Sequence, residues 1–413
     1  MKGQFITLEA RDGSGSFRAY LSLPRTGRGP GIVLAQEIFG INAYIREVAD
    51  YYAEEGYVVL APDLFWRQGR DIELGYSEPE WQRAFELYQA FDVDKGVDDL
   101  IAAAAQLRRR PECTGGVGVL GFCLGGKLAY LAACRGDVDV AVGYYGVGID
   151  QHLAEDAARR AALVLHFAEK DAYCDAAARA RIQAALAGRD DTEVYVYPGV
   201  DHAFARTGSP HFDKPAAAMA HQRSIAALRR RLGPHYDLSA LWDKHCEHEF
   251  ATRDVDATMA TMVDQPYVNH IPTMTGGVGH DALKRFYKYH FLDRNPPDTR
   301  LLPISRTIGA SQIVDELLFC FTHTIEIDWM LPGIEPTGRY VEVPLVAIVK
   351  FRGDKLYHEH IYWDQASVLV QIGKLDPRGL PVAGIDTARK LLDETRPSNT
   401  LMQRWESSAG LPI

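Results

Sequence analysis

Short apolar runs alternate with amphipathic segments through the first half of the chain. The runs predict buried strands at 31–35, 57–61, 116–120, 162–167 and 193–197. The segments between them predict helices at about 43–55, 80–109, 126–134 and 213–231. Strands and helices that alternate in this way imply right-handed crossovers and helices on both faces of a sheet. The first half is therefore expected to be an α/β domain with a doubly wound, mostly parallel sheet.

The pattern changes from about Asp237 onward. Helical stretches at 238–252, 255–262 and 280–291 precede long alternating runs that predict strands at 312–328, 340–352 and 355–370. Helices followed by long antiparallel strands indicate an α+β domain. The length of 413 residues also exceeds the roughly 100 to 200 residues of a usual domain. We expect two domains, 1–235 and 236–413, and place a C-terminal tail in the second.

Composition and charge argue against several classes of partner and site. A net charge of −10 argues against nucleic acid or an anionic membrane as the main partner. The N-terminal segment lacks the apolar core of a signal peptide and no run is long enough to span a bilayer, so a cytoplasmic protein is expected. The six cysteines have neither disulfide nor zinc spacing. No glycine loop for a dinucleotide is evident, and we expect no cofactor and no metal.

The segment GFCLGG (121–126) joins a predicted strand to a predicted helix. Glycines two residues before and two after Cys123 relieve crowding at a sharp turn whose central side chain points into the open. A cysteine at that position is a candidate nucleophile, and the amide of Leu124 would face an oxyanion formed on an attacked carbonyl. The alternative is a small buried cysteine beside a glycine-rich turn.

Chain order favours the nucleophile. Asp171 follows the predicted strand at 162–167, and His202 follows the predicted strand at 193–197. An α/β-hydrolase presents its nucleophile, acid and histidine in this order, each at the C-terminal end of a strand. Taken singly, Asp171 could be a loop carboxylate and His202 a turn histidine. Together with Cys123, they predict a catalytic triad.

Five segments of the first half carry a specific resemblance. They are QEIFG (36–40), APDL (61–64), GFCLGG (121–126), GYYG (143–146) and HAFAR (202–206). With them, residues 1 to about 235 resemble the dienelactone hydrolase (carboxymethylenebutenolidase) family, which has the α/β-hydrolase fold. The resemblance implies a hydrolase that opens a small carboxylated enol-lactone, with an acyl-enzyme formed on the cysteine.

The same resemblance assigns roles around Cys123. Glu37 matches a glutamate that holds the resting thiol and takes its proton when substrate is bound; its alternative role is a helix cap at the end of a strand. The amides of Leu124 and Ile38 are the expected oxyanion donors. His202 would then activate water, or the released enolate would assist, to free the diacid.

Substrate binding is expected at Arg206, which the resemblance assigns to a substrate carboxylate, and at Phe39 and Tyr144. A loop arginine at the surface is the alternative for Arg206. The family places a second carboxylate-binding arginine at the position of Trp81, and this chain departs from it there. Arg83 lies two residues on and does not share the same helix face. Either the helix shifts to bring Arg83 in, or Arg206 alone anchors the substrate and the pocket is more apolar.

The second half resembles the SnoaL-like branch of the NTF2 superfamily, a cone of helices against a curved sheet. The resemblance rests on YVNH (267–270), HEHIYWDQA (358–366) and LPVAG (380–384). The candidates for a pocket in this cone are His270, His358, His360 and Asp364, with His323, Glu326 and Asp328 as further titratable groups. His358 and His360 are two residues apart on a predicted strand, so they share one face and could bind a metal. No third ligand at suggestive spacing is evident. Polar residues on a half-exposed sheet or on a homodimer face are the alternative.

Three functions remain open for the whole chain. The first is a cysteine hydrolase for a small lactone or carboxylate substrate, with the cone supporting assembly or substrate. The second is a bifunctional protein whose cone isomerises or cyclises a related metabolite. The third is a binding module with a vestigial hydrolase. The complete set of Glu37, Cys123, Asp171 and His202 argues against the third, because a vestigial site should have lost a member.

Overall fold

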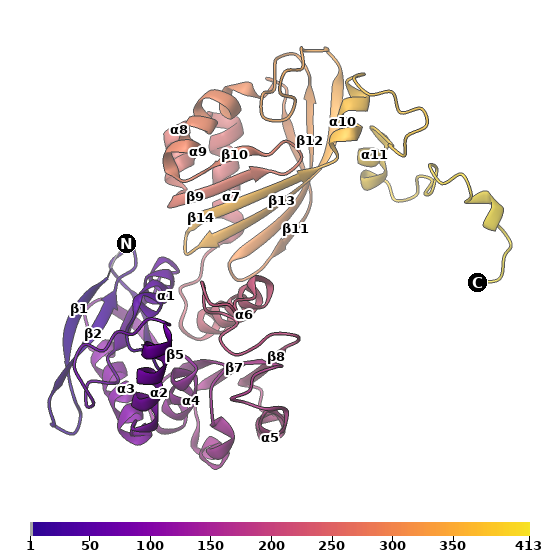
Figure 1. Cartoon of the computed structure of the whole chain (residues 1–413). Helices are drawn as coiled ribbons and strands as arrows, with labels where there is room; N and C mark the ends of the chain where they lie inside the picture. The colour runs from indigo at the N-terminus through magenta and orange to yellow at the C-terminus, as the bar shows by residue number, and fades with distance from the viewer. Residues whose placement is uncertain (1–2) are drawn as a thin grey trace. The chain divides into compact units, whose positions relative to one another are not determined.

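The first of the two sheets has eight strands in the order β1-β2-β4-β3-β5-β6-β7-β8. Its chain segment is coloured indigo to magenta in Figure 1. The strands are β1 (Gln4–Glu9), β2 (Ser16–Ser22), β3 (Gly29–Ala35), β4 (Val58–Pro62), β5 (Cys113–Phe122), β6 (Val140–Tyr144), β7 (Ala162–Ala168) and β8 (Thr192–Tyr197). Strands β3 to β8 are parallel to their neighbours, whereas β1 and β2 form an antiparallel edge. The predicted mostly parallel sheet is confirmed, and the antiparallel edge was not predicted.

The computed structural model describes residues 3–413, which divide into two compact units, 1–235 and 236–413. Helices of the first unit are α1 (Ala43–Glu54), α2 (Glu78–Gln89), α3 (Val93–Arg108), α4 (Leu124–Arg135), η1 (Ile149–Gln151), η2 (Leu153–Ala158), α5 (Ala176–Leu186) and α6 (Lys214–Leu232). The residues predicted to be helical over 80–109 form two helices, α2 and α3, because the Asp92 carboxylate accepts the Lys95 amide and starts a new helix.

Helices pack on both faces of this sheet. Alternate residues of β5 point to opposite faces: Val119 packs in the core that contains α4, whereas a side chain at Gly118 would meet Leu232 of α6. Helix α4 is buried along nearly its whole length, from Leu124 to Cys134. The end of β5 and the start of α4 therefore lie at the centre of the unit, where the backbone is held most firmly.

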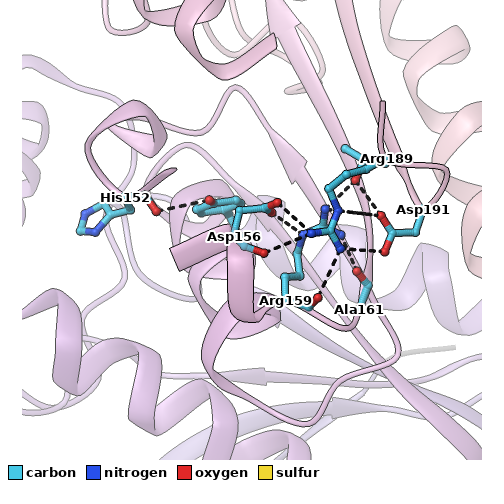
Figure 2. A network of polar contacts seen from close by, with 8 residues as sticks. His152, Asp156, Arg159, Ala161, Arg189 and Asp191 are labelled. Atoms are coloured by element: carbon cyan, nitrogen blue, oxygen red, sulfur yellow. Dashed lines mark hydrogen bonds and ion pairs between the residues drawn. The ribbon is translucent and has the colours of Figure 1, made fainter. Parts of the chain in front are cut away.

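A buried ion-pair network joins η2 to β7 and β8 (Figure 2). The Arg159 side chain donates to Asp156 at 2.6 Å and to the Ala161 carbonyl at 2.5 Å. Arg189 bridges Asp156 and Asp191, at 3.1 Å to each carboxylate. Hydrogen bonds from Arg189 lower the pKa of Asp191 to about 2. The network fixes the segment that follows β6, whose first residues line the cavity described below.

The second unit has a six-stranded sheet in the order β10-β9-β14-β13-β12-β11. The strands are β9 (Met262–His270), β10 (Thr275–Val278), β11 (Arg300–Ile308), β12 (Gln312–Thr322), β13 (Tyr340–Arg352) and β14 (Lys355–Trp363). Only the β14 and β9 pair is parallel among these strands. Buried residues alternate strictly along β13, as expected of a strand with one face on a core.

Helices of the second unit are α7 (Leu238–Cys246), η3 (Glu247–Thr252), α8 (Val255–Ala260), α9 (His280–Phe286), η4 (Tyr287–Phe291), η5 (Leu292–Arg294), α10 (Gln365–Gln371), α11 (Asp386–Leu392) and η6 (Glu406–Ser408). The predicted helices at 238–252 and 280–291 both end in π-helical turns, η3 and η4. The strand predicted over 355–370 is wrong beyond Trp363, because Asp364 caps α10. The strand predicted over 312–328 ends at Thr322. No helix within 3–413 is long and apolar enough to cross a membrane.

Candidate active site

Cys123 sits between the last residue of β5 and the first residue of α4. Its backbone has φ 54° and ψ −116°, a conformation that non-glycine residues rarely adopt. The Cys123 amide donates to the Tyr144 carbonyl at 3.0 Å, which holds the turn against β6. Such strain persists only where surrounding structure fixes it, and it is frequent at functional sites.

The flanking glycines are explained by close backbone approach. A Cβ at Gly121 would lie 2.0 Å from the Gly125 carbonyl oxygen. A Cβ at Gly125 would lie 2.4 Å from the carbonyl oxygen of Ala35, at the end of β3. Because backbone atoms stand in both places, neither position accepts a side chain without a shift of the turn. The glycines thus allow β3, β5 and α4 to meet beneath Cys123.

His202 and Asp171 lie together as their chain order predicts. The His202 Nδ1 is 2.8 Å from the Asp171 Oδ2, and the Tyr173 amide donates to the other Asp171 oxygen at 2.8 Å. The ring of His202 also hydrogen-bonds to the Cys123 side chain. Burial by itself lowers the pKa of His202, but its contacts with the Cys123 side chain and with Asp171 outweigh burial and raise the pKa to about 10. The Asp171 carboxylate thus favours the protonated imidazole.

Glu37 and Arg206 form a buried ion pair at the same end of the sheet. The Arg206 Nη1 donates to the Glu37 Oε2 at 3.1 Å, and both side chains are buried. The guanidinium carbon of Arg206 lies 4.4 Å from the centroid of the Tyr76 ring. Burial opposes the charge of Arg206, but Glu37 raises the pKa of the guanidinium. Arg206 is therefore not a surface loop arginine, and the helix cap expected as the alternative for Glu37 is provided by Asn42 at α1.

These side chains face one cavity of about 350 Å³, the first cavity. A volume of this size fits a small-molecule ligand. Polar groups on its wall include Glu37, Cys123, Lys127, Asp150, Arg181, His202 and Arg206; aromatic groups are Phe39, Trp81, Phe85, Tyr88 and Tyr173. The cavity thus combines apolar ring surfaces with a thiol, an imidazole and cationic groups.

Other residues predicted for this site divide into two groups. Ile38 lines the first cavity, and Leu124 begins α4, where the first amides have no intrahelical acceptor. Trp81 also lines it, 4.9 Å from Phe39 between ring centroids. Tyr144 does not, because its hydroxyl is buried at 2.7 Å from the Ser224 Oγ.

Arg83 lies outside the cavity wall, unlike Trp81 on the same helix. Its side chain is 53% exposed and donates to Glu86 at 2.9 Å. Of the two alternatives left open, helix α2 does not turn to bring Arg83 into the site, because Trp81 occupies the face toward the cavity.

Lys127 is a cavity residue that the sequence reasoning missed. It lies one turn beyond Cys123 on α4 and is only 8% exposed, and burial lowers its pKa. Within 3–413 its ammonium makes no hydrogen bond or ion pair, whereas Arg181 pairs with Asp150 at 2.6 Å. The signal was available, because residues four apart on a helix share a face.

The four candidates of the second unit do not form one group, although two of them are in contact. His358 and His360 stack at 4.5 Å between ring centroids on one face of β14. His270 is buried among aromatic rings and donates toward the Thr275 carbonyl at 3.2 Å; burial lowers its pKa to about 4. The Asp364 carboxylate accepts amides at the start of α10.

The further titratable groups of this unit have local partners. His323 Nδ1 is 3.2 Å from the Thr337 Oγ1, and Asp328 pairs with His290 at 2.5 Å. Glu326 lies in the turn that follows β12. None of the three belongs to the group of side chains described next.

A different group of side chains converges inside the second unit: the His245 cluster of His245, Glu249 and Glu359. The His245 Nε2 is 3.1 Å from the Glu249 Oε1 and 3.2 Å from the Glu359 Oε1. All three are buried. One signal was available in the sequence, because His245 and Glu249 are four residues apart in a predicted helix. Glu359 alternates with the two histidines of β14, and the fold shows that its face is the buried one.

Comparison with known proteins shows that the first unit is similar in sequence to the members of one family. The sequence pattern of the "Dienelactone hydrolase family" matches residues 17–232. A protein of Azospirillum brasilense is 40% identical over 240 residues, 55% of this chain and 99% of that protein. The carboxymethylenebutenolidase of Pseudomonas sp. (strain P51) is 38% identical over 226 residues, 54% of this chain and 94% of that protein.

Two further comparisons cover the same half. Carboxymethylenebutenolidase 1 of Cupriavidus pinatubonensis is 38% identical over 224 residues, 54% of this chain and 95% of that protein. A crystal structure from Klebsiella pneumoniae aligns with a TM-score of 0.48 and 25% identity, covering 55% of this chain and 99% of that one. The chain therefore belongs to the dienelactone hydrolase family through its first unit, and it is a hydrolase that acts on lactone or ester bonds.

Proposed function

We propose that the chain opens a small carboxylated enol-lactone through an acyl-enzyme on Cys123. The observation that carries this proposal is one cavity whose wall holds Cys123, His202 and the Glu37–Arg206 pair. A nucleophile, a base with an orienting acid, and a cation for a carboxylate are the groups that the reaction requires.

The first step is activation of the thiol. In the absence of substrate, Glu37 is paired with Arg206. A substrate carboxylate that binds Arg206 competes with Glu37 for the guanidinium. The released Glu37 carboxylate then takes the proton of Cys123, so a full nucleophile forms when a ligand is present. A thiol that is quiet between turnovers is also less exposed to oxidation.

The thiolate attacks the lactone carbonyl carbon, and a carbon–sulfur bond forms. The amides of Leu124 and Ile38 stabilise the oxyanion of the tetrahedral intermediate. Its collapse breaks the ring carbon–oxygen bond, and the opened chain stays on Cys123 as a thioester that carries the enolate at its other end. Water then attacks the thioester, and its proton passes to His202 or to the enolate. Breakage of the carbon–sulfur bond frees the diacid as the thiolate leaves, and Glu37 gives back the proton it took, which restores the thiol and the free carboxylate.

The cavity also suggests how substrate is anchored without an arginine at position 81. Lys127 supplies a buried ammonium on the wall of the cavity that holds Arg206. We propose that Lys127 takes the second contact to the substrate carboxylate. A charge-assisted hydrogen bond of this type contributes about 1.5 to 3 kcal/mol. Trp81 and Phe39 then cover the planar ring of the lactone.

Hydrolysis of a dienelactone by wild type and by Cys123→Ala tests the mechanism. We expect kcat/KM to fall at least about 1000-fold in the variant, because the nucleophile is gone. Intact-mass measurement of a rapidly quenched wild-type reaction should show a covalent adduct that Cys123→Ala lacks. Cys134→Ala is the matched control, since Cys134 is buried on the same helix outside the cavity wall. Equal activity of wild type and Cys123→Ala would overturn the proposal.

For the second unit we propose an NTF2-like cone over 236–413 that assembles the chain as a homodimer. The buried cavity beside Glu249 and Glu359 has a volume of about 40 Å³, which is too small for a cyclic metabolite. The outer face of its sheet carries Val346, Ile348 and Tyr362, with Val346 paired to Tyr362 across β13 and β14. Ile348→Glu should convert a dimer into a monomer in sedimentation equilibrium, and a wild-type monomer would refute this role.

A further inference from the structure

We infer that the His245 cluster binds one divalent transition-metal ion, with His245, Glu249 and Glu359 as its protein ligands. The cluster lies wholly in the second unit and is separate from the hydrolase site. One imidazole and two carboxylates form a mixed nitrogen and oxygen donor set, which suits Zn²⁺ and Mn²⁺. Ca²⁺ requires six to eight oxygen ligands, more than these side chains offer.

The distances between the donor atoms match a shared ion. Metal–ligand bonds of about 2.1 Å place neighbouring ligand atoms about 3.0 Å apart in an octahedral site and about 3.4 Å apart in a tetrahedral site. The His245 Nε2 lies 3.1 Å from one carboxylate and 3.2 Å from the other. The three donor atoms all fall within 4.8 Å of one another. An ion can therefore enter with only small side-chain movements.

The hydrogen bond that His245 makes through Nδ1 leaves Nε2 as the ring nitrogen available to an ion. The Thr261 hydroxyl donates to the Thr258 carbonyl at 2.6 Å, so its oxygen accepts a hydrogen bond from the His245 Nδ1 at 2.6 Å. The Nε2 atom faces Glu249 and Glu359, and an ion that displaces its proton would meet a lone pair aimed between the two carboxylates. Metal-binding histidines are held in this way by a second partner on the other ring nitrogen. Trp242 stacks on the ring at 5.6 Å and fixes its plane.

Charge balance favours the same conclusion. Glu249 and Glu359 are each 3% exposed, and they share His245 as an ion-pair partner, which carries at most one positive charge for the two carboxylates. Two carboxylates are costly to bury unless they are paired or coordinate a metal. One divalent cation with a neutral imidazole neutralises both of them at once.

An open coordination position faces the cavity of about 40 Å³, the second cavity. Glu249, Glu359 and His270 are on its wall, and the remainder is mostly apolar, including Phe291 and Trp329. This volume holds about one water molecule. The site thus offers three protein ligands and room for water or a small oxygen ligand. Glu249 also lies in the π-helical turn η3, an element that is frequent at functional sites.

Binding of Zn²⁺ to the full chain, after treatment with a chelator and dialysis, tests the inference. Isothermal titration should show a site of one Zn²⁺ per chain, and Glu249→Gln and Glu359→Gln should each weaken it by about 100-fold or more. Thr261→Val, which removes only the outer hydrogen bond, should weaken it by about 10-fold. His358→Gln with His360→Gln is the matched control and should bind Zn²⁺ as wild type does.

Binding of Mn²⁺ to the full chain can be measured by electron paramagnetic resonance. Because Mn²⁺ prefers oxygen ligands, Mn²⁺ binding would exclude a site built on cysteine thiolates. Circular dichroism confirms that each variant is folded; should Glu359→Gln not fold, Glu249→Gln and Thr261→Val decide the outcome. Three results would overturn the inference: no ion bound by wild type, unchanged affinity in the folded Glu249 and Thr261 variants, or loss of binding in the double-histidine control. Any of these would leave the cluster as an ion-pair core.

Discussion

The first and second cavities bury similar chemical groups in opposite settings. The first, of about 350 Å³, is lined by side chains from helices and from loops that follow the carboxyl ends of parallel strands. The second, of about 40 Å³, lies between helices and the inner face of a mostly antiparallel sheet. Each holds histidine near carboxylate, yet only the first has room for an organic substrate.

The difference shows what decides the use of a histidine–carboxylate pair. In the first cavity, Asp171 orients His202 toward a thiol, and the remaining space can admit a carbonyl carbon. In the second, two carboxylates converge on one ring nitrogen of His245, and the remaining space admits one water. The same residue types therefore serve proton transfer in one unit and, by our inference, metal binding in the other.

The largest expected effect is the loss of activity on substitution of His202, compared with another loop histidine of the first unit. His202→Gln should lower kcat for dienelactone hydrolysis by about 1000-fold, because it removes the base that Asp171 orients. Steady-state kinetics measures the fall. His211→Gln is the matched control: His211 is also a loop histidine near a carboxylate, 3.6 Å from Asp201, but it is not on the cavity wall. Equal losses in both variants would contradict the assigned role of His202.

A second prediction concerns His166, a buried histidine of the first unit that should make its stability depend on pH. It is fully buried between Tyr197 and Ser224, and burial lowers its pKa to about 3, below the ordinary 6.5. Between these pH values the unfolded chain binds a proton that the folded chain does not, so stability is lost as pH falls below 6.5. This group alone should cost about 2 kcal/mol of unfolding free energy between pH 7 and pH 5.

Urea titrations at the two pH values measure this loss, and loss of hydrolase activity identifies the transition of the first unit. His166→Gln should have a smaller difference between pH 7 and pH 5 than wild type, whatever its stability at neutral pH. An unchanged difference would show that His166 is not the group that responds to acid.

The first unit was predictable because its determinants are local. Glycines 121 and 125 are required by backbone contacts within one turn, and the order of Cys123, Asp171 and His202 follows from strand ends that meet at one edge. Lys127 was missed although its spacing from Cys123 placed it on the same helix face. The antiparallel edge was missed because its strands pair across distant parts of the chain.

The second unit was less predictable because its polar groups meet only through tertiary packing. The sequence singled out His358 and His360, which share the face of β14 opposite to Glu359. No local pattern says which face of a strand meets the core when both carry ionisable groups. Glu359 joins His245 only after β14 pairs with β9 and α7 packs on the sheet.

A smaller effect is expected at Lys127, which distinguishes a cationic cavity from one anchored by Arg206 alone. Lys127→Met keeps the aliphatic stem but removes the charge, so KM for a carboxylated lactone should rise by about 10-fold with little change in kcat. Arg83→Met is the control, because Arg83 is exposed and paired with Glu86. A neutral lactone should show no rise in either variant. If KM rose equally in Arg83→Met and Lys127→Met, the effect would come from the loss of any positive charge, and Lys127 would have no specific contact with the substrate.

The smallest effect tests the assignment of Asp364 to structure. Its carboxylate accepts the amides of Ala366 and Ser367, and its second oxygen accepts the Ser367 hydroxyl at 2.6 Å. Asp364→Ala should therefore lower the unfolding free energy of the second unit by about 1 kcal/mol, the usual loss for a helix cap. Asp364→Asn, which keeps a capping oxygen, should recover most of it in the same denaturant titration. Zn²⁺ affinity should not change in either variant, because Asp364 is outside the His245 cluster; a change would place this end of β14 in the metal site.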